Sequence, residues 1–278
     1  MKFNSDVITS RNNPLVKWAA SLSDKKGRSS ARSFIAEGEK LTLEALKSNL
    51  PITHIFLSEK KATSFIERIS QYKTSTKYEN TQIICLSEST FDKISTEKSP
   101  EGVISVIKYL DFFFNIDIIY KEEFFVDPQE RALILCSVRD PGNLGSVIRS
   151  AVAFGVQHVI LSPDCADIYN PKTVRSAMGS LFKIKISILS DLTEFILVAR
   201  ALGRRVFAAE LTDGARSISD IGLRNDDIVM IGNEGHGIPR EISASCSGSV
   251  YIPISEKTES LNASVAAAIF MWEQNKIN

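Results

Sequence analysis

The chain contains 278 residues, of which 44% are hydrophobic and 24% are charged. This length suggests two domains, and the composition is ordinary for a soluble globular protein. No apolar run is long enough to span a bilayer, and the polar N-terminus lacks the apolar core of a signal peptide, so we expect a cytoplasmic protein.

The cysteines and histidines give no metal-binding pattern. The four cysteines, Cys85, Cys136, Cys165 and Cys246, are widely scattered and form no CxxC pair, and the chain has only three histidines. Structural metal sites require several such ligands at close spacing. We therefore expect reduced thiols and no bound metal.

Basic residues gather at the N-terminal end, although the formal net charge is zero. A local basic face can attract a phosphate backbone even on a neutral protein. A solvated helical surface explains the same charges equally well. The candidates for contact with a nucleic-acid backbone in this segment are Arg11, Lys17, Lys25, Lys26, Arg28 and Arg32.

Residues 1–108 predict a small α/β domain. Helical periodicity is present over 40–47 and near 64–69. Residues 109–130 differ, because five phenylalanines stand among acidic residues. This stretch is predicted to be a linker. Its aromatic residues either dock onto a neighbouring molecule or, as we favour, belong to an ordinary connecting strand or helix buried between the domains. The strand-like runs of the first domain are residues 53–57, 82–86 and 102–107.

Residues 131–278 repeat a strand, a loop and a helix. Their strand-like runs are almost continuously apolar, as expected for buried parallel strands. Right-handed crossovers would place helices on both faces of the sheet. The predicted strands are residues 132–135, 156–161, 205–209, 227–231 and 249–254, and the predicted helices are residues 144–154, 191–202 and 261–274.

Three loops at strand ends carry unusual residues, and ligands of open α/β sheets bind at the carboxyl ends of strands. The first loop begins at Asp140-Pro141-Gly142, where Asn143 is a candidate N-cap and Arg149 lies further along the helix. A plain cap and a solvent-facing arginine would explain both residues without any function.

The second loop runs from Gly232 to Pro239 and has the spacing GxxGxG. Glycines allow tight turns and close approach of a ligand, but such loops are common. Glu234 is more informative, because a charge at a buried strand end is costly unless it is used or paired.

The third loop follows Ile252-Pro253-Ile254. Ser260 is a candidate cap of the last helix, and Asn262 would lie in its first turn, where free N–H groups face a ligand. A capped, alanine-rich core helix would explain the same residues without a ligand.

In this order and spacing, the loops resemble the three signature motifs of the SpoU (TrmH-like) class of RNA ribose 2′-O-methyltransferases, within the SPOUT superfamily. The resemblance spans residues 131–278 and includes the segment from Asn170 to Gly179, although Ser176-Ala177 stands where many members have two hydroxyl residues. Residues 8–17 and 34–38 resemble the substrate-binding extension of ribosomal-RNA members.

The resemblance implies a C-terminal parallel-sheet α/β domain with a deep trefoil knot and a smaller, ribosomal-protein-like α/β RNA-binding domain. It also implies a homodimer and an RNA substrate, with ribosomal RNA favoured over transfer RNA because of the N-terminal extension. Arg175, in the intervening segment, is a further candidate for RNA contact.

The resemblance implies that S-adenosylmethionine is the cofactor. Gly232, Ile252 and Leu261 match the family's cofactor-binding positions, and much of the contact is expected from the backbone because these residues have no polar side chain. Neighbouring residues and the end of a preceding strand complete the expected set, namely Asn233, Gly235, Gly237 and Ala209.

The polar active-site positions of the family match Asn143, Arg149, Glu234, Ser260 and Asn262. Family proposals make Arg149 the proton acceptor, aided by RNA phosphate, but a guanidinium is essentially always protonated. We therefore expect Arg149 to clamp phosphate and position the 2′-oxygen. Asn143, Ser260 and Asn262 would orient the ribose and the methionine part of the cofactor. Glu234 would hold the loop or Arg149.

Other classes of protein make different demands on the sequence. A dehydrogenase would need GxGxxG after residues 132–135, and the sequence does not supply it. A non-catalytic RNA-binding or ribosome-assembly protein would be expected to have lost the polar motif residues, which are present. Methylation of a base in place of a ribose is a third option, but the knotted methyltransferases that act on bases have different loop residues. Methylation of transfer RNA in place of ribosomal RNA stays open.

Overall fold

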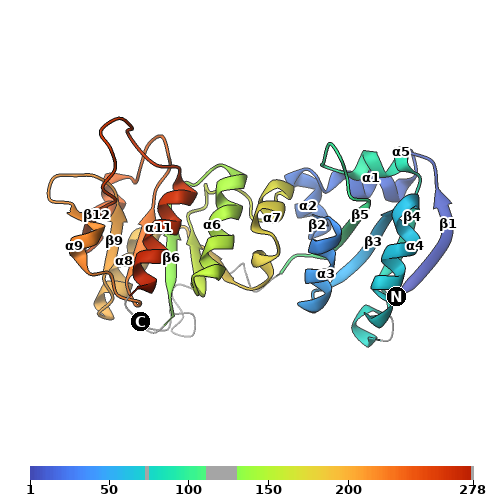
Figure 1. The fold of residues 1–278 in the computed structure, drawn as a ribbon, viewed down its shortest axis with the longest axis horizontal. Helices are drawn as coiled ribbons and strands as arrows, with labels where there is room; N and C mark the ends of the chain where they lie inside the picture. Colours follow the sequence, from blue (N-terminus) through green and yellow to red (C-terminus); the bar gives the residue numbers. More distant parts are fainter. Residues whose placement is uncertain (73–74, 111–129, 277–278) are drawn as a thin grey trace. The chain divides into compact units, whose positions relative to one another are not determined.

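The computed structural model describes residues 1–72, 75–110 and 130–276 (Figure 1). Of the predicted linker over residues 109–130, residues 111–129 lie outside this part of the chain, so the linker stays a prediction. No helix in the described ranges is long and apolar enough to cross a membrane.

The chain forms two compact units. The first consists of Met1–Tyr109 and Asp167–Phe182, and the second consists of Leu110–Ala166 and Lys183–Asn278. The predicted C-terminal domain, residues 131–278, includes Asp167–Phe182, whereas in the structure this segment packs with the first unit. Contacts of Tyr169 and Asp167 with that unit account for the difference.

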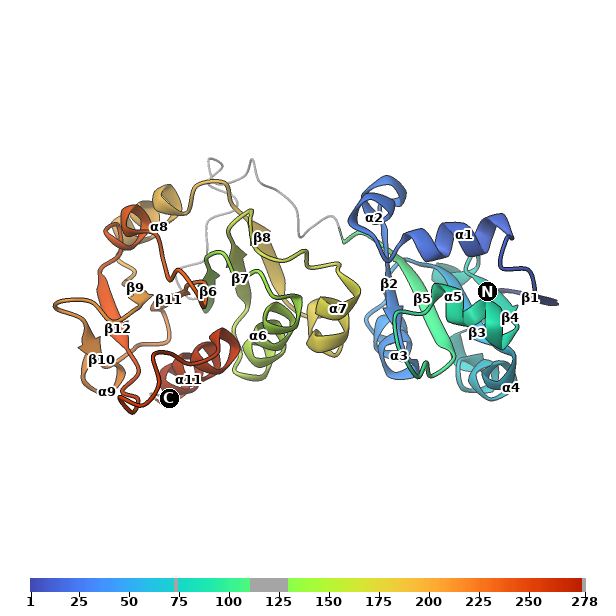
Figure 2. The same cartoon turned by 90° about the horizontal axis from the view of Figure 1, so that it is seen from above.

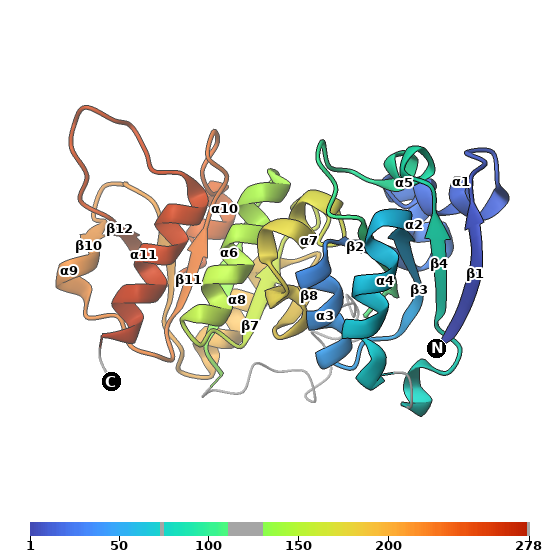
Figure 3. The same ribbon diagram turned by 45° about the vertical axis from the view of Figure 1, so that its right-hand side comes forward.

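The first unit is built on a five-stranded mixed sheet with helices on both faces. Its elements are β1 (Lys2–Ile8), α1 (Pro14–Ser21), α2 (Lys25–Ala31), β2 (Ser33–Glu37), α3 (Glu39–Lys47), β3 (Ile52–Ser58), α4 (Glu59–Arg68), β4 (Gln82–Leu86), α5 (Glu88–Ile94), β5 (Val103–Lys108) and α7 (Pro171–Ala177). The strand order is β1-β4-β3-β5-β2, and only β5 runs antiparallel to its neighbours. Helix α1 lies on one side of the sheet, and α3 and α4 lie on the other (Figures 2 and 3).

The predicted helix over residues 40–47 and the three predicted strands of this unit are confirmed to within two residues. The predicted helix near residues 64–69 begins five residues earlier, at Glu59. Helix α2 was not predicted, because its sequence KKGRSSA has no apolar stripe at helical spacing.

The segment Asp167–Phe182 completes the core of the first unit at β2, the edge strand of its sheet. Tyr169 is almost fully buried and stacks on Phe34 of β2 with ring centroids 4.5 Å apart. Tyr109 stacks on Tyr169 at 4.2 Å. Stacked aromatic rings bury large apolar areas, so this column ties residues distant in sequence into one core.

Arg28 of α2 is held in the same region, with its side chain only 2% exposed. Its guanidinium donates to the carbonyl oxygens of Leu22 (3.1 Å) and Ser23 (2.6 Å) and forms an ion pair with Asp167 at 2.6 Å. A buried guanidinium engaged in this way is not accessible to a nucleic acid. The predicted RNA contact of Arg28 is therefore corrected, because its interactions are internal.

Replacing Arg28 with methionine is expected to lower the free energy of unfolding by about 2–4 kcal/mol, because Asp167 loses its partner and two carbonyl groups lose their donor. Urea denaturation followed by circular dichroism measures this change. Lys26→Met is the matched control, because Lys26 is exposed on the same helix. Equal stability of the two variants would contradict the structural role of Arg28.

The second unit contains a seven-stranded sheet in which all paired strands are parallel. Its elements are β6 (Ala132–Leu135), α6 (Pro141–Ala153), β7 (His158–Leu161), β8 (Lys185–Ile188), α8 (Leu192–Ala201), β9 (Val206–Ala209), β10 (Arg216–Ser217), α9 (Ile218–Ile221), β11 (Ile228–Ile231), α10 (Arg240–Ser243), β12 (Gly248–Tyr251) and α11 (Ala263–Asn275). The strand order is β10-β12-β9-β11-β6-β7-β8. The predicted parallel sheet is thus confirmed.

Helices cover both faces of this sheet, as predicted. Helix α8 lies on one side of the strands, and α6 and α11, which pack together, lie on the other (Figure 2). Ile134 of β6 and Met230 of β11 share a core with Phe195 of α8. The four residues of β6 are all buried, which explains why the central strands are continuously apolar.

Candidate active site

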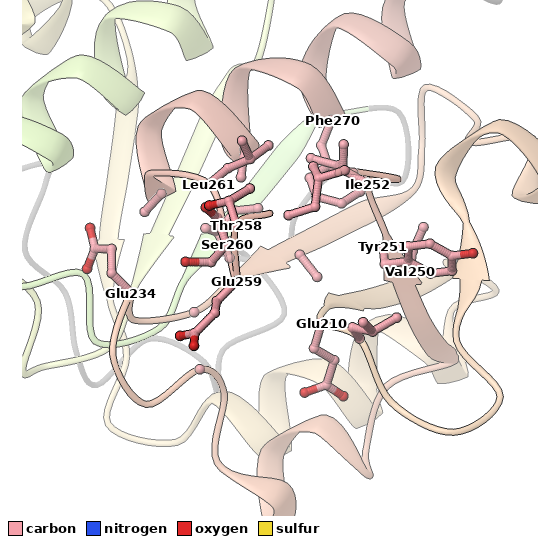
Figure 4. A pocket seen from close by; sticks show the side chains of 18 of the residues that line it. Glu210, Glu234, Val250, Tyr251, Ile252, Thr258, Glu259, Ser260, Leu261 and Phe270 are labelled. Carbon is pink, nitrogen blue, oxygen red and sulfur yellow. The ribbon is translucent and has the colours of Figure 1, made fainter. Parts of the chain in front are cut away.

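The three loops singled out in the sequence meet at one edge of the second unit's sheet. They follow β6, β11 and β12, and because these strands are parallel their carboxyl ends lie on the same side. A cavity of about 540 Å³ opens there (Figure 4). The predicted site residues that line it are Ala209, Gly232, Asn233, Glu234, Gly237, Ile252, Ser260 and Leu261.

The loop after β11 is held in a fixed shape by Asn233. Its backbone exchanges two hydrogen bonds with Gly237, at 3.1 and 2.9 Å. Its side-chain oxygen accepts from the backbone N–H groups of Gly235 and His236, and its amide donates to the carbonyl oxygen of Ser137 at 2.8 Å. Asn233 therefore ties this loop to the residues after β6. Gly235 was predicted to bind the cofactor but is not among the described residues that line the cavity.

Gly232 occupies a position where no side chain fits. A Cβ atom built on it would lie 2.6 Å from the carbonyl carbon of Gly237 and 2.7 Å from a side-chain carbon of Ile238. Such distances are well inside van der Waals contact. The glycine thus lets the loop close tightly on itself where it lines the cavity.

The caps of the two helices at the site differ from the predicted ones. Asp140, not Asn143, caps α6, and its carboxylate accepts the backbone N–H of Asn143 at 2.8 Å. Pro141 occupies the first helical turn, which fixes this register. Asn262, not Ser260, caps α11 and accepts from the N–H of Ser264 at 2.9 Å. Asn143 is consequently free to use its side chain elsewhere.

A chain of side-chain hydrogen bonds joins the three loops. The amide of Asn262 donates to Asn143 Oδ1 at 3.0 Å, and the amide of Asn143 donates to Glu234 Oε1 at 2.5 Å. The orientation of both amides is thereby fixed, since each one's donor and acceptor sides have defined partners. These three residues are exposed or half-buried, so they form a polar cluster that a substrate can reach.

Ser260 and Arg149 lie outside this hydrogen-bond chain. Ser260 is exposed and lines the cavity. Arg149 is an exposed residue of α6, and within the described ranges it forms no ion pair. Glu234 was predicted to hold either its loop or Arg149, and the structure instead pairs it with Asn143.

Sequence reasoning missed several residues of the cavity. Glu210 follows β9 directly, at the same sheet edge, so its position after a predicted strand could have identified it. Glu259 is adjacent to the predicted residue Ser260, so its place in the third loop was a further signal. The missed polar or aromatic residues are Glu210, Tyr251, Ser255, Glu256, Thr258, Glu259 and Phe270.

The cavity suits a cofactor of the size of S-adenosylmethionine. Ligand pockets of roughly 300–1,000 Å³ with a mostly apolar lining and a few polar groups are typical of such sites. Here the apolar side chains of Ile252, Leu261 and Phe270 face the cavity, and its polar lining includes the carboxylates of Glu210 and Glu259 (Figure 4).

A parallel sheet whose strand-end loops join a ligand cavity to a fixed amide–carboxylate cluster defines a cofactor-dependent α/β enzyme. The chain belongs to the SpoU rRNA Methylase family, whose members match it over residues 130–272. Residues 13–105 match an MRM3-like substrate binding domain.

Relatives along the whole chain agree with this membership. The chain is 31% identical over 266 residues to a 23S rRNA (guanosine(2553)-2′-O)-methyltransferase of Bacillus subtilis, covering 95% of this chain and 97% of the relative. An rRNA methyltransferase structure from Sinorhizobium meliloti is 29% identical with a TM-score of 0.82, covering 99% and 98% of the two chains. A structure of rRNA methyltransferase from that organism with AdoMet bound is 28% identical with a TM-score of 0.81, covering 98% and 97%.

Proposed function

We propose that this protein transfers a methyl group from S-adenosylmethionine to a ribose 2′-hydroxyl of large-subunit ribosomal RNA. The observation that carries the proposal is the chain of hydrogen bonds from Asn262 through Asn143 to Glu234 beside the cofactor cavity. The names of the relatives, which are 23S rRNA 2′-O-methyltransferases, support the reaction and the substrate.

The protein's contribution to the reaction is mainly positioning. S-adenosylmethionine, when bound, supplies a methyl group already activated by a sulfonium. Gly232, Ile252 and Leu261 hold the cofactor, and Asn143 and Asn262, which are linked to the lining residue Glu234, orient the ribose beside the cavity. Orienting two reactants in this way can account for a large share of a rate enhancement. Arg149 binds an RNA phosphate and so places the 2′-oxygen.

The first unit provides RNA-binding surface in this proposal. Arg11, Lys17, Lys25 and Lys26 are exposed on or beside α1 and α2. The side chains of the two other predicted arginines already contact other residues of the first unit. Arg32 lies over the Tyr109 ring at 5.4 Å, and Arg175 forms an ion pair with Glu97. We therefore assign the main phosphate contacts to the four exposed residues.

The test of the function uses radiolabelled S-adenosylmethionine and RNA from a strain that lacks the gene. We expect label in a 2′-O-methylated nucleoside of large-subunit ribosomal RNA. Label in transfer RNA would preserve the reaction and replace the substrate. Label on a base would overturn the reaction, and absence of cofactor binding would favour a non-catalytic RNA-binding protein.

Replacing Asn143 with alanine is expected to lower kcat roughly 100-fold, because one fixed polar group at a reacting centre typically contributes that much. The Kd for S-adenosylmethionine should change less than about twofold, since Asn143 does not line the cavity. Single-turnover kinetics and calorimetry measure the two quantities. A large loss of cofactor affinity with unchanged kcat would refute this assignment.

We also propose that the protein is a cytoplasmic homodimer with a knotted C-terminal domain, as the family resemblance implies. Analytical ultracentrifugation tests the dimer, since it gives the mass of the species in solution. A single monomeric species at micromolar concentration would overturn that part of the proposal.

A further inference from the structure

All charged side chains among the described residues that line the cofactor cavity are acidic. The described lining contains four glutamates and no lysine or arginine. Lys257 belongs to the same loop as Glu256 and Glu259 but is exposed and is not a lining residue. Glu234 is engaged with Asn143, and the other three carboxylates, Glu210, Glu256 and Glu259, have no role in the methyl transfer described above.

Among the described residues, Glu210 is the one of these three whose carboxylate accepts a hydrogen bond. Its backbone N–H donates to the carbonyl oxygen of Val250 at 3.1 Å, and its Oε1 accepts from the Ser249 hydroxyl at 2.8 Å. Both partners belong to β12, so Glu210 is fixed by two adjacent strands. It is half-buried, and within the described part of the chain its Oε2 has no hydrogen-bond donor. Figure 4 shows the Glu210 and Glu259 carboxylates on the same side of the cavity.

The reaction changes the charge of the molecule that this cavity binds. S-adenosylmethionine carries one net positive charge, from a sulfonium and an ammonium against one carboxylate. S-adenosylhomocysteine, the product, has a neutral thioether and no net charge. The two molecules otherwise have almost the same shape, so apolar contacts discriminate between them poorly. A negative cavity does discriminate, because it attracts a molecule with a net positive charge more strongly than a zwitterion with no net charge.

We propose that Glu210, assisted by Glu259, selects the charged cofactor over its neutral product and so favours release of the product after each methyl transfer. This inference rests on the proposed function, because it concerns the cofactor of that reaction. The carboxylates need not touch the sulfonium. At roughly 8 Å in water, two unit charges interact strongly enough to change an equilibrium constant about twofold.

The test measures the Kd of S-adenosylmethionine and of S-adenosylhomocysteine by calorimetry in the full chain. The variants are E210Q, E259Q and the double variant, and E241Q is the control, because Glu241 is an exposed glutamate outside the cavity. Glutamine keeps the shape of the side chain and its bond with Ser249. We expect the ratio of product Kd to cofactor Kd to fall roughly twofold for each neutralised carboxylate and about fourfold in the double variant.

The salt dependence gives a second readout. The ratio in the unmodified protein should fall as sodium chloride rises from about 0.05 to about 0.5 M, while the ratio in the double variant should change less. A ratio of the two Kd values that is unchanged in every variant would overturn the proposal. An equal loss of affinity for both molecules would also overturn it, because the carboxylates would then contact a part that both molecules share and would not sense the sulfonium charge. Failure of the unmodified protein to bind either molecule would instead overturn the proposed function.

Discussion

The variant Arg149→Lys is expected to lower kcat roughly 100-fold and Arg149→Ala somewhat more, with cofactor Kd values unchanged within about twofold. Arginine binds phosphate through two parallel N–H groups in a rigid fork, and lysine offers only a point charge. If Arg149 places the 2′-oxygen by holding an RNA phosphate, the loss of this geometry removes the alignment and not only the charge.

The position of Arg149 supports this role. It follows Asn143 by six residues on α6, which is about 9 Å along a helix axis. A separation of this size suits two different groups of an RNA chain, a ribose held near Asn143 and a phosphate held by Arg149. It does not suit two residues that act on one atom. Arg149 is also exposed and forms no ion pair within the described residues, so its guanidinium is available.

Steady-state kinetics with RNA, together with calorimetry for the cofactor, test this prediction. Arg216→Lys is a matched control, because Arg216 is an exposed arginine on β10, at the far edge of the same sheet. Near-full activity of Arg149→Lys would exclude phosphate binding through two parallel N–H groups. It would mean that only the positive charge at this position matters. An equal loss in the Arg216 variant would indicate a general effect of charge or folding.

The variant Gly232→Ala is expected to weaken binding of S-adenosylmethionine roughly 10- to 100-fold, because fitting an extra methyl group into a tightly packed position costs about 1–3 kcal/mol, and about 1.4 kcal/mol is tenfold in affinity. The new Cβ would lie 2.6 Å from the backbone of Gly237, so the loop must move. Asn233 and Glu234 of that loop both line the cavity, and Glu234 also accepts the hydrogen bond from Asn143. Calorimetry measures the binding, and thermal unfolding shows whether the variant is folded.

Gly235→Ala is the control for this experiment. A Cβ at Gly235 would approach only the Asn233 side-chain oxygen, at 3.4 Å, and Gly235 is not among the described lining residues. We expect its affinity for the cofactor to change less than about threefold. If both alanine variants bind equally well, the tight closure at Gly232 has no role in cofactor binding.

The apolar pattern of the sequence was sufficient to predict the central strands, and polar elements were not predictable in this way. Strands such as β6 and β11 are buried on both faces, so they are recognisable as apolar runs. The edge strand β1 has the sequence KFNSDVI, and α2 has KKGRSSA. Neither sequence has the hydrophobic periodicity of a half-buried element. The secondary structure of both segments therefore depends on tertiary packing and could not be predicted from the local sequence.

The candidate site was predictable where a motif lies in one loop and less so where it depends on contacts between distant residues. The glycine loop and Asn262 were identified from local sequence. The cap at Asp140 was not, because Asp140 and Asn143 are both good caps, although Pro141 at the first helical position points to Asp140. The burial of Arg28 depends on Asp167, a partner 139 residues away.

The segment Asp167–Phe182 has a consequence for how this chain is made. When residues 1–109 leave the ribosome, Phe34 has no Tyr169 to stack on and Arg28 has no counter-ion. At roughly 5–20 residues per second, the missing segment follows about 4–15 s later. During that interval the nascent N-terminal half exposes an apolar patch at the edge strand β2, the type of surface on which aggregation begins. The first unit therefore matures only after part of the C-terminal half has been synthesised, and a truncation at residue 109 would keep it permanently in the unfinished state.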